Sequence, residues 1–513
     1  MRAPITRPPP LLLEPLRKEK TTRKHSQHRV NGNLAFLVAL LTFGCMTCFG
    51  TAWYLYTTRW ETRPTNSLRS SADLTSQVIV TEDFNANDLD HTRKYLSYLP
   101  HSGFHNQRIA FENAILLSRI LNRTLLVPPI RLGKKPIRYV EYNTLSRFLE
   151  LSGKEGLLHC PRIPVSLSLP LECLQYFESS YVPWTWLINM TTLAEHQLLL
   201  HLPNLSQAWI RAHLNLSPRD VYTLRDTSPY HFRFLDTLSD SSPPTDRYQE
   251  DIYINQLAAV NERLLQIGTL FGSSRLRLRN EENIAYLKTV RRNMVFKNHD
   301  LDSVAERIAQ RLGNSYLGLH LRSADGKFKK NVEASIKNAW WRIVVDTLGL
   351  GLTALCELEK FLPVDSSSRC SEAGSLTIDF PTADPSPEAG WLSHSLRYDG
   401  RCRADRHSEL RYRVLNIPLY IATDLDSPEV NPSLEIFRRT FPCLFFLGDF
   451  RKDIEPLESL RNSVDDVNLF SFSLPFVEAL VLGKAMKVVG TEGSTFSKYV
   501  ENVLWPSFRN SSM

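Results

Sequence analysis

A histidine and an arginine separated by one position are the first residues of this chain suited to chemistry. They close the stretch Tyr316-Leu-Gly-Leu-His-Leu-Arg322, whose apolar residues predict a buried strand over Tyr316–Leu321. Side chains two positions apart on a strand share a face, so His320 and Arg322 are expected together at its carboxyl end. Ligands of open α/β sheets gather at that end. Arg322 could hold two phosphate oxygens there, with His320 positioning it or a ribose. The alternative is a surface arginine beside a core histidine.

A second stretch combines glycines with hydroxyl side chains. Val488–Ser497 reads V-V-G-T-E-G-S-T-F-S. It predicts the end of a strand (Met486–Val489), a glycine turn, and the start of a helix over Lys498–Val503. Ser494 or Thr495 could simply cap that helix. Capping leaves other N–H groups and hydroxyls for a phosphate, so both interpretations stay open.

The third stretch is Tyr98–Pro129, which predicts a βαβ unit. A strand over Tyr95–Leu99 leads into the loop Pro100–Asn106, a helix over Gln107–Leu121 and a second strand over Leu125–Val127. The loop that opens such a helix is a place to bind an anion. The alternative is a buried scaffold whose loop binds nothing.

The residues of this third stretch resemble a known family. Gly-Phe-His-Asn-Gln (103–107), followed by Leu-Asn-Arg-Thr-Leu-Leu-Val-Pro-Pro (121–129), resembles the first motif of the GDP-fucose protein O-fucosyltransferase family. In that motif Gly-Arg-Phe-Gly-Asn-Gln precedes the helix. His-Leu-Arg (320–322) resembles the family's His-x-Arg signature, and Gly490-x-x-x-Ser-Thr-Phe-Ser497 resembles its third motif. The chain looks like a fungal-type, membrane-anchored member.

The resemblance implies roles for individual residues. Arg322 would bind the diphosphate of the departing GDP, and Asn106 would orient groups beside the reacting sugar, because a neutral amide is no strong base. These two are the expected catalytic residues. His105 replaces a family glycine, a departure that could change how the acceptor fits. The expected donor-binding residues are Gly103, Phe104, His105, Asn106, His320, Arg322, Asp424, Glu478, Ser494, Thr495 and Phe496.

Carboxylates leave several alternatives open. Asp424 follows the predicted strand Leu419–Thr423 in a family-like Ile-Ala-Thr-Asp, and it could also cap a helix. Glu478 aligns by spacing with a family aspartate that accepts guanine N–H groups, although it could merely face solvent. Asp465 and Asp466 are rival guanine-binding residues. Glu112 lies on the predicted helix beyond Asn106 and is a less favoured candidate for the base. No Asp-x-Asp follows an apolar strand, so neither a metal nor a cofactor is expected beyond GDP-fucose as donor substrate.

Strands and helices alternate in both halves of the chain, which predicts an α/β protein with two domains. We expect a first Rossmann-like domain over residues 91–300 and a second over 301–513, the latter with a Ser/Pro-rich insertion over about 363–406. Within the first, Asp251–Phe271 and Asn283–Val295 look helical, and Thr192–Leu205 suggests buried helix. The resemblance implies a GT-B-like arrangement, with the two domains facing across a cleft.

The N-terminal residues predict a membrane anchor. Residues 1–33 hold eight Lys/Arg and two Asp/Glu, so they carry +6 of the net +7, and the remainder shows no basic stripe for nucleic acid. Residues 34–56 are uncharged and long enough for one transmembrane helix. The positive-inside rule then leaves 1–33 in the cytosol and places the rest, after a stem over 57–90, in the lumen. A cleaved signal peptide is the alternative.

The six cysteines beyond the predicted span permit three disulfides, as expected in a secretory compartment. Close spacing favours Cys160–Cys173 and makes Cys356–Cys370 plausible. Together these features predict a type II membrane protein of the Golgi or endoplasmic reticulum. The functional hypothesis is an inverting glycosyltransferase that moves fucose from GDP-fucose to a protein or glycan hydroxyl. Alternatives are a transferase using another nucleotide sugar and an inactive lumenal binding protein on the same fold.

Overall fold

The structure, a computed structural model, describes residues 36, 38–51, 53, 92–164, 166–237, 247–323, 326–359, 398 and 400–510. The chain divides into two compact units, residues 1–77 and residues 78–513. The predicted domain boundary near residue 300 lies inside the second unit and stays a prediction. The predicted tail 1–33 and stem 57–90, and most of the insertion 363–406, lie outside the described residues.

Residues 38–51 are helical and fall within the predicted span 34–56, parts of which are not among the described residues. No helix in the described part of the chain combines the length and the apolar character that crossing a membrane requires.

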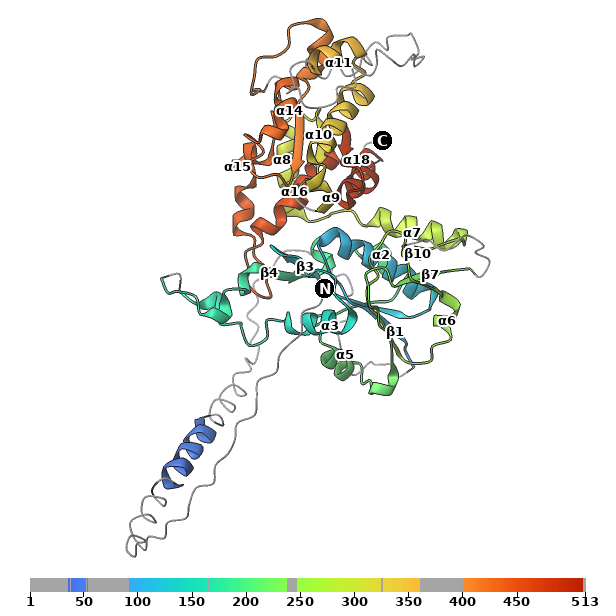
Figure 1. Ribbon diagram of the computed structural model, residues 1–513, viewed down its shortest axis with the longest axis vertical. Helices are drawn as coiled ribbons and strands as arrows, with labels where there is room; N and C mark the ends of the chain where they lie inside the picture. Colours follow the sequence, from blue (N-terminus) through green and yellow to red (C-terminus); the bar gives the residue numbers. More distant parts are fainter. Residues whose placement is uncertain are drawn as a thin grey trace, which may run out of the picture. The chain divides into compact units, whose positions relative to one another are not determined.

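A five-stranded parallel sheet begins the second unit (Figure 1). Its strands run in the order β5-β2-β1-β9-β6, with β1 buried along its whole length in the middle. Helix α2 connects β1 to the parallel strand β2, which confirms the predicted βαβ unit. The bounds are β1 Tyr95–Tyr98, β2 Thr124–Val127, β5 Leu199–His201, β6 Val221–Leu224 and β9 Leu264–Ile267.

Helix α2 (Phe104–Ile120) begins three residues earlier than predicted. Gly103, in an extended conformation, is its N-cap residue, so His105 and Asn106 lie in the first helical turn and not in a loop. The side chains from Gln107 to Ser118 are all buried, because α7 (Glu281–Asn293) covers the face that the sheet leaves open.

A second parallel sheet lies in the last 200 residues, in the order β13-β12-β11-β14. Its strands are β11 Leu317–Leu321, β12 Leu419–Thr423, β13 Leu444–Phe445 and β14 Lys487–Gly490, and β11, β12 and β14 match predicted strands. The register pairs Leu321 with Thr423 and His320 with Gly490. The carboxyl ends of three neighbouring strands therefore meet, and the residues after them share one edge. This α/β fold with parallel sheets is the fold class predicted from the sequence.

Two expectations for the middle of the chain are wrong. The region Asp251–Phe271 contains β8 (Glu250–Tyr253), the short helix α6 (Ile254–Ala258) and the buried strand β9, where one long helix was expected. Thr192–Leu205 likewise contains the strand β5. Short apolar runs have the same composition in a buried strand and in a buried helix, so periodicity could not distinguish them.

The described part of the second unit contains further strands and helices. A three-stranded parallel sheet has the order β10-β7-β8, and β3 pairs with β4 in an antiparallel ribbon. The other strands are β3 Ile130–Gly133, β4 Ser179–Val182, β7 Phe232–Leu235 and β10 Leu276–Arg277. The other helices are α3 Tyr142–Leu151, α4 Thr191–Ala194, α5 Gln207–His213, α8 His299–Arg311, α9 Gly326–Lys330, α10 Val332–Trp341, α11 Leu352–Glu359, α14 Glu435–Thr440, α15 Arg451–Ile454, α16 Phe470–Lys484, α17 Thr495–Tyr499 and α18 Trp505–Asn510.

One hydrophobic core joins elements from the five-stranded and the four-stranded parallel sheets. The ring of Phe476 on α16 lies 4.9 Å from that of Phe104 on α2 and 5.3 Å from that of Phe296. A polar contact adds to this: Asp465 accepts hydrogen bonds from Lys154 and from Ser180 on β4. These contacts hold the start of α2 and strand β4 against α16 and the segment before it.

The disulfide Cys160–Cys173 is present, as predicted. A second disulfide joins Cys402 and Cys443, a pair that spacing did not suggest because 41 positions separate the two residues. Cys356 is also disulfide-bonded. Its suggested partner, Cys370, lies outside the described residues.

Candidate active site

A cavity of about 810 Å³ lies between the start of α2 and the carboxyl edge of the second sheet. Eight of the eleven residues predicted to bind the donor line it, although they come from three distant stretches of the chain. The predicted residues at the cavity are Gly103, Phe104, His105, Asn106, Arg322, Ser494, Thr495 and Phe496. His320, Asp424 and Glu478 do not line it.

The first-motif residues are held in place by a glutamine that the sequence analysis did not single out. The Gln107 amide nitrogen donates to the carbonyls of Ser102 (3.1 Å) and Arg131 (2.9 Å), and its oxygen accepts from the Arg131 N–H (2.9 Å). This buried side chain fastens the start of α2 to β3. Its place beside Asn106 in the motif was the available signal.

Arg322 follows β11 and reaches the cavity. Its Nε lies 3.2 Å from Asp424 Oδ2, an ion pair that fixes the direction of the guanidinium. The other Asp424 oxygen, Oδ1, accepts from the Ser323 N–H (2.6 Å) and the Ser323 hydroxyl (2.8 Å). Asp424 thus does not line the cavity itself; it contacts Arg322, which does, and orients its guanidinium.

His320 also lies behind the cavity wall. Its Nδ1 is 2.7 Å from Ser497 Oγ, and its ring stacks on Phe496 with 4.2 Å between centroids. The pKa of His320 is lowered to about 3, chiefly by burial; the charge of Asp424 opposes this shift and that of Arg322 contributes to it. His320 is therefore neutral and supports the phenylalanine that faces the cavity.

The turn after β14 depends on close contact between Gly490 and Ser497. A Cβ at Gly490 would overlap the Ser497 side chain, so only glycine fits. Thr491, which the sequence analysis did not identify, joins the strand ends: its N–H donates to Ser497 Oγ (3.0 Å), and its Oγ1 accepts from the Arg322 N–H (2.9 Å).

Ser494 caps α17, as one interpretation predicted. Its buried side chain accepts a hydrogen bond from the Ser497 N–H (3.3 Å). The same residue lines the cavity with Thr495 and Phe496. Capping and a place at the site are therefore compatible. The Ser494 cap occupies the Ser497 N–H; the other N–H groups of the first turn have no partner within the helix and are available to a bound group.

The three candidate guanine-binding carboxylates have different surroundings. Burial raises the pKa of Glu478, on α16, to about 8, and the charge of Asp424 adds to the effect. At neutral pH Glu478 is then mostly protonated, whereas accepting two guanine N–H groups requires a carboxylate. Asp465 is buried and bonded to Lys154 and Ser180. Asp466 is exposed beside Arg461.

Among the described residues, the charged side chains lining the cavity all belong to basic residues: Arg131, Lys134, Arg138 and Arg322. No Asp or Glu of the described part of the chain lines it. A cavity of this charge favours an anionic ligand.

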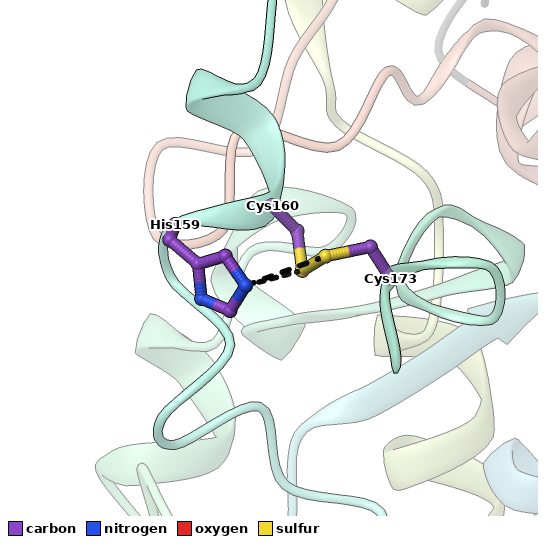
Figure 2. A group of neighbouring side chains, drawn as sticks. All are labelled: His159, Cys160 and Cys173. Atoms are coloured by element: carbon purple, nitrogen blue, oxygen red, sulfur yellow. Dashed lines mark hydrogen bonds between the residues drawn. A yellow bond between two sulfur atoms is a disulfide. The ribbon is translucent and has the colours of Figure 1, made fainter. Parts of the chain in front are cut away.

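Within the described part of the chain, one group has the spacing of metal ligands: His159, Cys160 and Cys173 (Figure 2). The two sulfur atoms form a disulfide, so they are not thiolate ligands. His159 Nε2 lies 3.6 Å from Cys173 Sγ and 3.9 Å from Cys160 Sγ.

The fold and the cavity define an α/β protein with a basic binding site between the start of α2 and the carboxyl edge of the four-stranded parallel sheet. No family model matches the chain. O-fucosyltransferase 30 of Arabidopsis thaliana is 60% identical to it over 38 residues, which are 7% of this chain and 8% of that protein. The chain thus matches less than a tenth of the length of this curated relative.

Solved structures give low similarity scores over long alignments. A crystal structure of POFUT1 in complex with GDP has a TM-score of 0.34 at 13% identity, covering 80% of this chain and 94% of that one. POFUT1 in complex with GDP-fucose has a TM-score of 0.33 at 13% identity, with the same coverage.

Proposed function

We propose that this chain is an inverting glycosyltransferase that transfers fucose from GDP-fucose to a hydroxyl group of a protein or glycan. One observation carries the proposal: Asn106, Arg322 and the residues Ser494–Phe496 converge on one cavity, and the charged residues among its described lining are all basic. They are the residues that the family resemblance assigns to sugar and diphosphate. The 38-residue match to a protein named an O-fucosyltransferase is in keeping with this function.

In the proposed reaction the acceptor oxygen attacks C1 of the fucosyl group while the bond from C1 to the β-phosphate oxygen breaks. The electron pair leaves on GDP. Arg322, directed by Asp424, would offset the charge that develops on the diphosphate, so its contribution is largest in the transition state. Asn106 would orient the reacting sugar by hydrogen bonding. The Ser494–Phe496 turn would bind phosphate through N–H and hydroxyl groups.

The test is nucleotide binding and donor turnover by the purified full-length chain. We expect GDP and GDP-fucose to bind more tightly than GDP-mannose and UDP. Arg322→Lys keeps the charge but loses the guanidinium, which can donate two parallel hydrogen bonds to the diphosphate. About one charge-assisted hydrogen bond is lost, which is about 1.5–3 kcal/mol of stabilisation. The rate should then fall about 10- to 150-fold. Arg451→Lys, at an exposed position on α15, is the matched control.

The possible outcomes separate the alternatives. A preference for another nucleotide sugar would retain the site and change the donor. Tight GDP-fucose binding without any turnover would indicate a binding protein on this fold. Wild-type turnover by Arg322→Lys would show that the arginine does not act on the diphosphate.

We also propose, from the sequence, that residues 34–56 anchor the chain in the membrane of the Golgi or endoplasmic reticulum with residues 57–513 in the lumen. The uncharged span and the basic residues before it support this topology. Protease treatment of intact microsomes tests it. The chain after the anchor should be protected, and its digestion without detergent would contradict the topology.

A further inference from the structure

His105 takes the place of a family glycine, and its imidazole lies in an unusual environment. Its ring is 5.0 Å from Phe104, 4.9 Å from Phe496 and 5.0 Å from Tyr499, measured between centroids. Three aromatic side chains from two elements therefore hold one ring at the cavity wall. Such packing fixes the direction of the imidazole and reduces the entropy lost when it meets a ligand.

The ring nitrogens of His105 make no hydrogen bond within the described part of the chain. Nδ1 is buried and without a partner. Because Nδ1 is the covered nitrogen, Nε2 is the one that can reach the cavity that His105 lines. Buried polar groups are usually bonded, and an exception beside a site calls for an explanation.

Burial and the neighbouring charges keep His105 neutral. Burial lowers its pKa well below the ordinary value, and three cationic or ionisable neighbours act in the same direction: Arg108, His320 and Arg322. Arg108 belongs to α2 and lies over the Tyr499 ring from α17, 4.6 Å from its centroid. His320 and Arg322 come from the end of β11. A neutral imidazole with a free nitrogen can accept a proton.

We propose that His105 is the general base of the transfer: its Nε2 takes the proton of the acceptor hydroxyl as that oxygen attacks C1. This inference rests on the proposed function. The proton moves from oxygen to Nε2, the oxygen–C1 bond forms, and the bond from C1 to the β-phosphate oxygen breaks with its electron pair leaving on GDP. The imidazolium then returns its proton to water. Asn106, the next residue, has no basic nitrogen to do this.

Donor binding would strengthen this base. Arg322 is one of the charges that disfavour protonation of His105, and it is also the proposed ligand of the diphosphate. Phosphate charges placed against Arg322 offset its effect, so His105 becomes more basic when the donor is bound. A general base works best with a pKa near the working pH. The histidine is therefore a weak base in the free protein and a stronger one in the donor complex.

The first test uses water as the acceptor, because the natural acceptor is unidentified. We would follow GDP release from GDP-fucose by the full-length chain, by His105→Gly and by His105→Gln. Loss of a general base lowers such rates by about 10²- to 10⁴-fold. GDP should still bind both variants within about threefold of wild type. Added imidazole should restore part of the rate to His105→Gly, which has a space for it, and none to His105→Gln.

Several outcomes would overturn the assignment. One is a His105→Gly rate near wild type; another is a slow variant that binds GDP normally and gains nothing from imidazole. The acid limb of the wild-type pH profile should disappear in both variants, and its persistence would also count against the base. If wild type binds no GDP-fucose, the proposed function fails first. If wild type releases GDP from GDP-fucose and both His105 variants do so at the same rate, the general-base role is wrong and the proposed function is not.

The second test is an equilibrium measurement that needs no turnover. If GDP makes His105 more basic, protonation of His105 must strengthen GDP binding by the same factor. Between pH 8 and pH 5.5 the GDP affinity of wild type should rise relative to that of His105→Gln. Subtracting the pH dependence measured for His105→Gln removes the contribution that the titration of GDP itself makes to the affinity. Parallel pH dependences would show that the histidine is not coupled to the diphosphate.

Discussion

Glu478 is a carboxyl group whose protonation should control the stability of the protein. It lies on α16, close enough to Asp424 for that charge to act on it, and burial is the main cause of its raised pKa. Glu478 in turn adds to the raised pKa of Tyr420, which is fully buried on β12. The perturbation that we would make is Glu478→Gln, which keeps the shape of the neutral side chain and can never be charged.

The magnitude follows from the two pKa values. Below pH 4.5 the carboxyl is protonated in both states. Between pH 4.5 and about 8 the unfolded chain has lost this proton while the folded chain retains it, so raising the pH favours unfolding. The slope is about 1.36 kcal/mol per pH unit, which amounts to at most about 5 kcal/mol by pH 8. The stability is thus greatest at low pH and is lost as the pH rises through this interval.

The assay is thermal unfolding of wild type and Glu478→Gln from pH 5 to pH 9. With an unfolding entropy of about 2 cal/mol/K per residue over residues 78–513, 5 kcal/mol corresponds to about 5 °C. The two proteins should melt together at pH 5, and the variant should melt about 5 °C higher at pH 8.5. The matched control is Glu455→Gln at an exposed position.

A melting difference that stays constant from pH 5 to pH 9 would refute this reasoning, because it would mean that Glu478 titrates alike in both states. Guanine recognition has a separate readout. If Glu478 binds guanine as a carboxylate, Glu478→Gln should lose the preference for GDP over UDP; if it is protonated and remote from the nucleotide, that preference should persist.

Two further substitutions test the supports of the cavity. Gly490→Ala should destabilise the protein by about 2–4 kcal/mol, because the new methyl group overlaps Ser497 and displaces its hydrogen bonds. The control is Gly103→Ala, whose Cβ meets nothing within 4 Å and which should melt like wild type. Equal melting temperatures for the two variants would contradict the prediction. Asp465→Asn should cost about 3–5 kcal/mol in thermal unfolding, because it leaves its lysine partner unpaired. Its exposed neighbour supplies the control, Asp466→Asn, at a position whose positive φ asparagine tolerates. A loss no larger than in this control would show that the buried pair contributes little.

The sequence predicted the second sheet well because its strands are short, apolar and bounded by turn residues. The runs ending at Leu321, Thr423 and Val489 were recognisable locally, and the motifs placed polar residues just after them. The first sheet was harder. Its strand β9 was predicted as helix, since Leu264-Leu-Gln-Ile has no period that favours either state. The start of α2 was predicted three residues too late, because its N-cap residue, Gly103, has no hydrogen-bonding side chain that would mark the helix start in the sequence.

The sequence by itself determined which residue types could take part: an arginine and hydroxyl groups after apolar strands, and a histidine–asparagine pair in a loop before a helix. The tertiary structure decided which of them meet. It placed Arg322 at the cavity and His320 behind it, because Ser497, 177 positions away, bonds the histidine. It also decided protonation, since the burial of His105 and Glu478 depends on neighbours from other elements. Burial and charge are properties of the packed surroundings, which no local pattern of residues contains.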